Sequence, residues 1–179
     1  MMGRTTLLRL VKDRRGAAAV EFAFIAPVLI LMYFGVVEFT QGMIVQRRVS
    51  HVASTAADLT SRVAQVSTSD TTDIFRVGRT IIYPLNPAPL RMRLTSITSD
   101  ASNVSRVDWS DASNWSSGAL APNSLVTVPS GVIGANQSVV MAEVEYTYTS
   151  PLRFLLPNGI LMSHVYYLRP RISNVVTHS

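Results

Sequence analysis

A long apolar run near the N-terminus dominates the pattern of hydrophobic and polar positions along this chain. Between Ala17 and Val37 the only charged residue is Glu21. An α-helix rises about 1.5 Å per residue, so this run spans about 31 Å, close to the hydrocarbon thickness of a bilayer. The pattern therefore predicts one membrane-spanning helix. Within it, Pro27 has no amide hydrogen to donate to Ala23, and we expect it to kink the helix.

Beyond the membrane segment, the apolar positions take on a heptad-like spacing that is typical of an amphipathic helix. They recur at alternating intervals of four and three residues, at Val45, Val49, Val52, Ala56, Leu59, Val63 and Val66. The helix is therefore predicted to continue to Val66. We expect this seam to pack on the chain's own globular body, because about three heptads are few for an intersubunit coiled coil, which is the alternative.

In the remainder of the chain, the pattern predicts one short helix and a set of strands. After a polar break at 67–72, residues 73–83 have helical spacing, and prolines from Pro84 onward end the helix. Alternating patterns predict strands at 90–97, 104–109, 125–128, 139–149 and 160–168. A Leu-Pro-Asn-Gly turn at 156–159 predicts that the last two strands form an antiparallel hairpin.

The predicted fold class is therefore α+β. A long N-terminal membrane helix continues into an amphipathic helix, and a small antiparallel β-sheet domain follows. This plan resembles the pilin-like α+β plan.

The charge distribution bears on the partners and the orientation of the chain. Most of the net charge of +5 lies in residues 1–16, which hold Arg4, Arg9, Lys12, Arg14 and Arg15 against Asp13. The rest is nearly neutral and offers no basic face, so no nucleic-acid partner is expected. Basic residues beside a membrane segment stay in the cytoplasm, and this leader outweighs Arg47 and Arg48 on the other side. We expect a cytoplasmic N-terminus and an exported body.

The residue types needed for catalysis or metal binding do not form a recognisable pattern. The chain has no cysteine, which excludes disulfides and thiolate sites. His51, His164 and His178 are far apart in sequence, and neither a phosphate loop nor a nucleophile elbow is present. We expect no metal, no cofactor and no enzymatic activity.

The most site-like polar segment is 108–115. Trp109, Asp111 and Trp115 form a possible partner surface, because exposed tryptophans beside carboxylates and amides suit a sugar or a partner protein. The favoured alternative is a buried tryptophan that anchors a loop. Asparagines nearby match the N-glycosylation acceptor, at Asn103, Asn114 and Asn136, although Asn- and Ser-rich loops explain them without glycans.

Glu21 is the unusual feature of the apolar run. An ionised side chain near the bilayer centre costs roughly 2.5 kcal/mol or more, so an acid there is by default a functional-site hypothesis with a partner to be named. The alternative is that Glu21 reaches the interface at the helix start, where the helix dipole favours a negative charge.

The residues around Glu21 support the functional alternative. Gly16-Ala-Ala-Ala-Val-Glu21-Phe22 resembles the class-III signal of type IV pilins and pseudopilins. The longer string RRGAAAVEFAFIAPVLILMYFGVVEF resembles the TadE-like family, which includes TadE and TadF, and the similarity extends over about residues 14–54. The Tyr-Leu-Arg-Pro-Arg string at 167–171 is also similar to that family.

This resemblance implies that a prepilin peptidase cuts between Gly16 and Ala17. Gly16 lets the protease approach the backbone. Glu21 then lies one helical turn from the new amine, on the same face. Glu21 and Phe22 correspond to the glutamate and the residue after it in the pilin motif. In related pilins this glutamate is thought to meet the N-terminal amine of a neighbouring subunit.

The favoured hypothesis is a TadE-like minor pseudopilin used in assembly of the tight-adherence (Flp) pilus. Its expected organisation is a cleaved cytoplasmic leader at 1–16, a transmembrane and amphipathic helix at 17–66 and a periplasmic α+β domain at 67–179. It would lie in a bacterial inner membrane, with the lipid bilayer, the prepilin peptidase, other Tad pilins or pseudopilins and the assembly platform as partners. The alternative is an uncleaved signal-anchor protein with a periplasmic ligand- or partner-binding domain.

Overall fold

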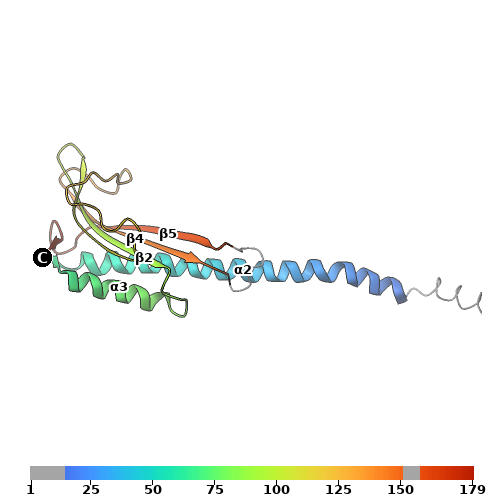
Figure 1. Ribbon diagram of the computed structural model, residues 1–179. Coiled ribbons are helices and arrows are strands. Elements are labelled where there is room, and N and C mark those ends of the chain that lie inside the picture. The colour runs from blue at the N-terminus through green and yellow to red at the C-terminus, as the bar shows by residue number, and fades with distance from the viewer. Residues whose placement is uncertain (1–14, 151–157) are drawn as a thin grey trace, which may run out of the picture. The chain divides into compact units, whose positions relative to one another are not determined.

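The computed structural model describes residues 15–150 and 158–179 (Figure 1). The chain forms two compact units, Met1–Gln41 and Gly42–Ser179. The boundary between them falls inside the long helix α2, Arg15–Ser61. The part of this helix after the boundary therefore belongs to the same unit as the sheet.

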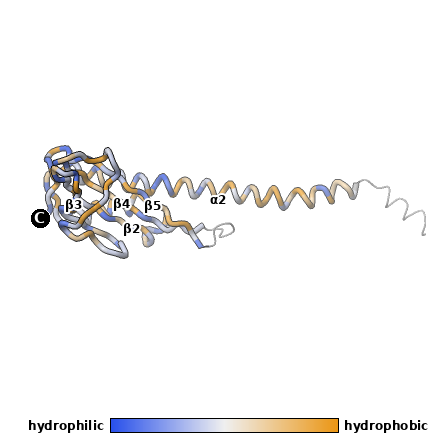
Figure 2. Tube along the Cα trace, turned by 90° about the horizontal axis from the view of Figure 1, so that it is seen from above, coloured by the Kyte–Doolittle hydropathy of each residue, from blue (hydrophilic) through white to orange (hydrophobic). Residues whose placement is uncertain are grey.

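The described part of the first unit is the N-terminal portion of α2, and most of its residues are hydrophobic (Figure 2). Phe22 and Phe24 keep 68% and 74% of their surface exposed, so little of their surface packs within this part of α2. Among the described residues, α2 is the one helix long and apolar enough to cross a membrane, judged by length and composition. Apolar side chains left exposed in this way favour a lipid or protein environment.

The second unit is built on a four-stranded antiparallel sheet in the order β3-β2-β4-β5. Its strands are β2 (Leu90–Ser99), β3 (Ser105–Ser113), β4 (Ser138–Tyr148) and β5 (Ile160–Leu168). A separate parallel pair joins β1 (Gln65–Val66) to β6 (Thr177–His178). The predicted α+β fold class, with a long N-terminal apolar helix and a small antiparallel sheet, is confirmed.

One face of the sheet packs on the helices of the second unit (Figure 1). Val49 and Val52 of α2 are buried in the same core as Ala142 and Val144 of β4. The first members of the heptad seam thus pack on the chain's own body, as expected. On the opposite face, Arg93 Nε donates to Glu143 Oε2 at 2.6 Å across neighbouring strands.

Helix α3, Thr68–Ile82, starts five residues earlier than the predicted start at residue 73. Ser67 and Asp70 form a capping box, in which each side chain accepts a hydrogen bond from the other residue's backbone amide. The hydrogen bonds from the side chain and backbone of Ser67 also hold the pKa of Asp70 below its usual value. The predicted polar break is therefore the cap and first turn of the helix. At the other end, Arg48 Nη1 donates to the carbonyl oxygens of Ile81, at 3.1 Å, and Tyr83.

The predicted end of the first helix at Val66 is wrong, because α2 ends at Ser61. Val66 is buried, but as part of strand β1, and Val63 is exposed. The amides of Thr177 and Ser179 donate to the carbonyl oxygens of Ala64 and Val66. Pairing with a segment more than a hundred residues away thus replaces the helical hydrogen bonds that the local pattern predicted.

Two further strand predictions need correction. Residues 125–128 form no strand, because Leu125 makes one isolated bridge with Arg106. Strand β3 extends to Ser113 instead of ending at residue 109, so part of the predicted long connection belongs to the sheet. Strands β4 and β5 pair in antiparallel register, as predicted for the hairpin. Most of its connecting segment, including residues 156 and 157 of the predicted turn, lies outside the described residues.

Candidate functional site

The predicted processing site lies on the first turns of α2. Gly16 and Ala17 are helical and exposed, and so are Glu21 and Phe22. A Cβ atom built on Gly16 meets nothing within 4 Å, and its φ is not positive. Neither the backbone conformation nor the packing of the described residues therefore requires glycine at this position.

Glu21 stands among exposed apolar side chains in this segment. It makes no hydrogen bond or ion pair with any residue that the structure describes. The helical spacing of four residues puts Ala17 and Glu21 on the same face of α2. Pro27 lies inside the helix six residues later, and the bend expected there stays a prediction.

In the 108–115 segment, the two tryptophans have different environments. Trp109 is buried, and its indole Nε1 donates to the carbonyl oxygen of Val176 at 2.7 Å. This is the arrangement of a tryptophan that anchors a distant segment, and it leaves Trp109 little surface to offer a partner. Trp115 is partly exposed, and the guanidinium carbon of Arg93 lies 4.6 Å from its ring centroid.

Asp111 links three elements of the second unit. Its Oδ2 accepts a hydrogen bond from Thr71 Oγ1 of α3 at 2.6 Å and lies 3.0 Å from His178 Nε2 of β6. The ring of His178 also packs beside Trp109, with centroids 5.2 Å apart. Sequence reasoning missed Thr71 and His178 as partners of Asp111, because no local pattern connects residues so far apart in the chain.

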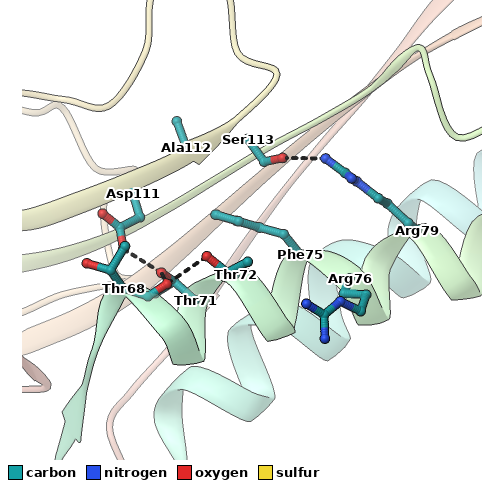
Figure 3. A pocket seen from close by; sticks show the side chains of 9 residues that line it. All are labelled: Thr68, Thr71, Thr72, Phe75, Arg76, Arg79, Asp111, Ala112 and Ser113. Carbon is teal, nitrogen blue, oxygen red and sulfur yellow. Dashed lines mark hydrogen bonds between the residues drawn. The ribbon is translucent and has the colours of Figure 1, made fainter.

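A cleft of about 290 Å³ opens beside Asp111, between α3 and the end of β3 (Figure 3). Its helix wall carries threonines, a buried phenylalanine and two arginines; its strand wall is Asp111–Ser113. Arg79 Nη2 crosses the cleft and donates to Ser113 Oγ at 3.1 Å. The sequence indicates the strand wall but not the threonines of the helix wall, because its pattern predicts a polar break where α3 has its first turn.

The asparagines of the three glycosylation-like sequences have a conformational role. Asn103, Asn114 and Asn136 all adopt positive φ, at 61°, 57° and 56°. Asparagine tolerates this left-handed region better than most residues with a side chain. The Nδ2 atom of Asn114 also donates to the carbonyl oxygens of Ala88 and Leu90, at 2.8 and 3.1 Å. Within residues 15–150 and 158–179, no group of three or more His, Asp or Glu residues could hold a metal ion.

The fold and the first candidate site together define an α+β protein with one N-terminal apolar helix, consistent with a single-pass membrane anchor. The family model described as TadE-like protein matches residues 16–58. This match confirms the TadE-like resemblance over that segment and suggests a protein related to the Tad pilus. The TadE-like family itself consists of structural pilus components and is not known as an enzyme family. No curated protein and no solved structure matches the chain.

The matched segment covers one of the two candidate sites. It begins at Gly16 and includes Glu21, Phe22 and Pro27. The cleft beside Asp111 lies outside it, so the TadE-like match carries no information about that cleft.

Proposed function

We propose that this protein is a minor pseudopilin that a prepilin peptidase cuts after Gly16 and that is needed for assembly of the tight-adherence (Flp) pilus. One observation carries the proposal. A glycine that the fold does not require stands five residues before a carboxylate, Glu21, that pairs with nothing in the described part of the chain. Both lie at the start of the TadE-like match.

The chemistry of cleavage accounts for this carboxylate. Cutting the Gly16–Ala17 bond creates an α-ammonium group on Ala17 at the start of an apolar helix. A cation in apolar surroundings is costly unless it is paired, and so is an isolated carboxylate. Pairing the ammonium group of one subunit with Glu21 of the next satisfies both charges and fixes the axial position of the incoming subunit.

The membrane orientation follows from the leader. The basic residues of 1–16 hold the N-terminus in the cytoplasm, so the helix crosses the bacterial inner membrane and the body enters the periplasm. In this arrangement the partners are the prepilin peptidase, other Tad pilins or pseudopilins, the assembly platform and the lipid bilayer.

Processing is tested by the intact mass of the protein extracted from membranes that contain an active prepilin peptidase. We expect Ala17 as the first residue of the native chain and an uncut chain for Gly16→Leu. Gly42→Ala is the control, because a methyl group there meets only Met162 Cε at 3.9 Å, and it should be processed like the native chain. A native chain that stays full length would contradict the proposal.

The second candidate function is an uncleaved signal-anchor protein whose exported domain binds a partner. The cleft beside Asp111 favours it, since that cleft lies outside the TadE-like match. In that case the native chain and Gly16→Leu both stay full length, and membrane insertion and pilus formation are the same in the two. Under the pseudopilin proposal, the same variant inserts but forms no pili.

A further inference from the structure

The cleft between α3 and β3 combines an aromatic floor with positive charge at one end. Phe75 extends from α3 toward Ala112 of β3, between the two walls (Figure 3). Threonines lie on one side of Phe75, and Arg76 and Arg79 lie on the other (Figure 3). The helical spacing brings these side chains onto the side of α3 that faces the end of β3.

The two arginines keep donor capacity that the chain does not use. Arg79 makes one hydrogen bond, to the neutral hydroxyl of Ser113, and has no carboxylate partner among residues 15–150 and 158–179. Arg76 Nη1 lies 2.9 Å from Asp73 Oδ1, but their side chains are 74% and 67% exposed. An ion pair so exposed contributes little to stability, so an incoming anion can replace Asp73 as the partner of Arg76 at a small cost in free energy.

The acid that lines the cleft is already paired within the fold. Asp111 Oδ2 accepts a hydrogen bond from the hydroxyl of Thr71 and contacts the imidazole of His178, and both partners belong to the same unit as Asp111. Asp70, at the start of α3, is bound to Ser67 in the capping box. The arginine end of the cleft is therefore complementary to a negative charge brought by a partner.

We propose that this cleft binds a carboxylate side chain of a protein partner through the guanidinium groups of Arg79 and Arg76, above the buried Phe75. Guanidinium groups and carboxylates form charge-assisted, bidentate hydrogen bonds, which are stronger than those between neutral groups. A volume of about 290 Å³ is at the small end of ligand sites and suits one or two side chains. Asp111 and Asp73 disfavour a doubly charged phosphate more than a singly charged carboxylate.

This assignment does not depend on cleavage after Gly16. Residues Asp111–Ser113 of the 108–115 segment form the strand wall of the cleft and so take part in recognition, while Trp109 stays in the core.

The test measures binding of defined peptides to the purified full-length protein in detergent, by calorimetry or ligand-observed NMR. The probe is the acetylated, amidated tetrapeptide Glu-Leu-Glu-Leu, and its neutral counterpart is Gln-Leu-Gln-Leu. We expect the acidic peptide to bind at least about tenfold more tightly than the neutral one, because a hydrogen bond to a charged group is worth about 1.5–3 kcal/mol. High salt should weaken the acidic peptide's binding.

Variants assign the binding to the cleft. Arg79→Gln should remove most of the preference for the acidic peptide. Arg79→Glu should reverse the preference, so that the basic peptide Lys-Leu-Lys-Leu binds more tightly than the acidic one. Arg62→Gln is the matched control, since Arg62 is an exposed arginine paired with Asp58 outside the cleft, and it should bind like the native chain. Circular dichroism confirms that each variant is folded.

Three results would overturn the inference. One is equal or absent binding of the acidic and neutral peptides. Another is an acidic preference that survives in Arg79→Gln or is lost in Arg62→Gln. The third is binding of glucuronate through Arg79 without binding of the acidic peptide, which would make the ligand an acidic sugar instead of a protein.

Discussion

At the scale of single residues, the charge of Glu21 is the feature that its surroundings in the described chain explain least. Its neighbours Phe22, Phe24 and Ile25 are apolar and exposed, and no described residue pairs with it. A carboxylate kept in such a place has a cost in lipid that a partner must offset. The partner we infer is the ammonium group that cleavage creates on a neighbouring subunit.

The variant Glu21→Gln removes this charge while keeping the shape of the side chain. We expect the amount of protein that assembles with its partner subunits to fall by roughly 30-fold or more, because a few kcal/mol of pairing energy is lost. Pilus counts by electron microscopy and co-purification of partner subunits measure the effect.

Glu21→Asp is the matched variant, because it keeps the charge and shortens the side chain by one methylene group. It should retain part of the assembly. If processing, assembly and pilus number are all unchanged in Glu21→Gln, the electrostatic pairing is wrong.

Single residues differ in how well the sequence predicts them. Glu21 is recognisable because it is the one charge in a long apolar run, and that contrast is local. The partners of Asp111 are not recognisable, because Thr71 and His178 reach it from a helix and from a strand far along the chain. Trp109 was predicted either as part of a partner surface or as an anchor, and only tertiary structure shows that Val176 accepts its indole hydrogen.

At the scale of elements, the packing of α3 depends on the absence of a side chain at Gly78. A Cβ atom there would lie 2.5 Å from Met92 Cε of β2 and 3.1 Å from Val52 Cγ1 of α2. The glycine therefore lets the helix approach both the sheet and the other helix closely. The buried end of Met92 fills the space that a larger residue would need.

We expect Gly78→Val to lower the free energy of unfolding by about 1–3 kcal/mol, the usual cost of overpacking a core. Gly42→Ala, on α2, should be neutral or raise it by up to about 1 kcal/mol, because alanine favours helix and the site has room. Thermal unfolding of the full chain in detergent, followed by circular dichroism, compares the two. Equal stability of Gly78→Val and the native chain would show that Met92 moves aside without cost.

The elements that the sequence predicts well are those whose pattern is set by burial on one face. Strand β4 has buried residues such as Val140 and Val144 alternating with Glu143 and Glu145, and both its position and its pairing with β5 agree with the prediction. The end of α2 was wrong because β1 gains its hydrogen bonds from β6, which has too few residues for a pattern of its own. The start of α3 was misplaced because its cap residues resemble those of a loop.

At the scale of the whole molecule, the basic leader and the apolar helix α2 together predict the orientation in the membrane. Because the chain contains no cysteine, one introduced cysteine reports its own location. Ser117 is exposed on a loop of the second unit. Ser99 is buried, and its Oγ has no hydrogen-bond partner among the described residues, so a cysteine is tolerated there.

We expect Ser117→Cys to react with a membrane-impermeant maleimide in intact spheroplasts. The buried Ser99→Cys should react only after denaturation and serves as the control for access. Gel shift or mass spectrometry measures the labelled fraction. Reaction of Ser117→Cys only after the membrane is permeabilised would place the body in the cytoplasm and contradict the proposed orientation.

The pairing of β6 with β1 has a practical consequence for tagging. The amide of Ser179 donates to Val66 and the ring of His178 contacts Asp111, so the last residues of the chain are integrated into the fold. A fluorescent protein or affinity epitope placed directly after Ser179 would crowd the β1–β6 pair and Trp109, which packs beside His178. An epitope inserted between the exposed Ser116 and Ser117 avoids that crowding and is the better position for imaging or purification.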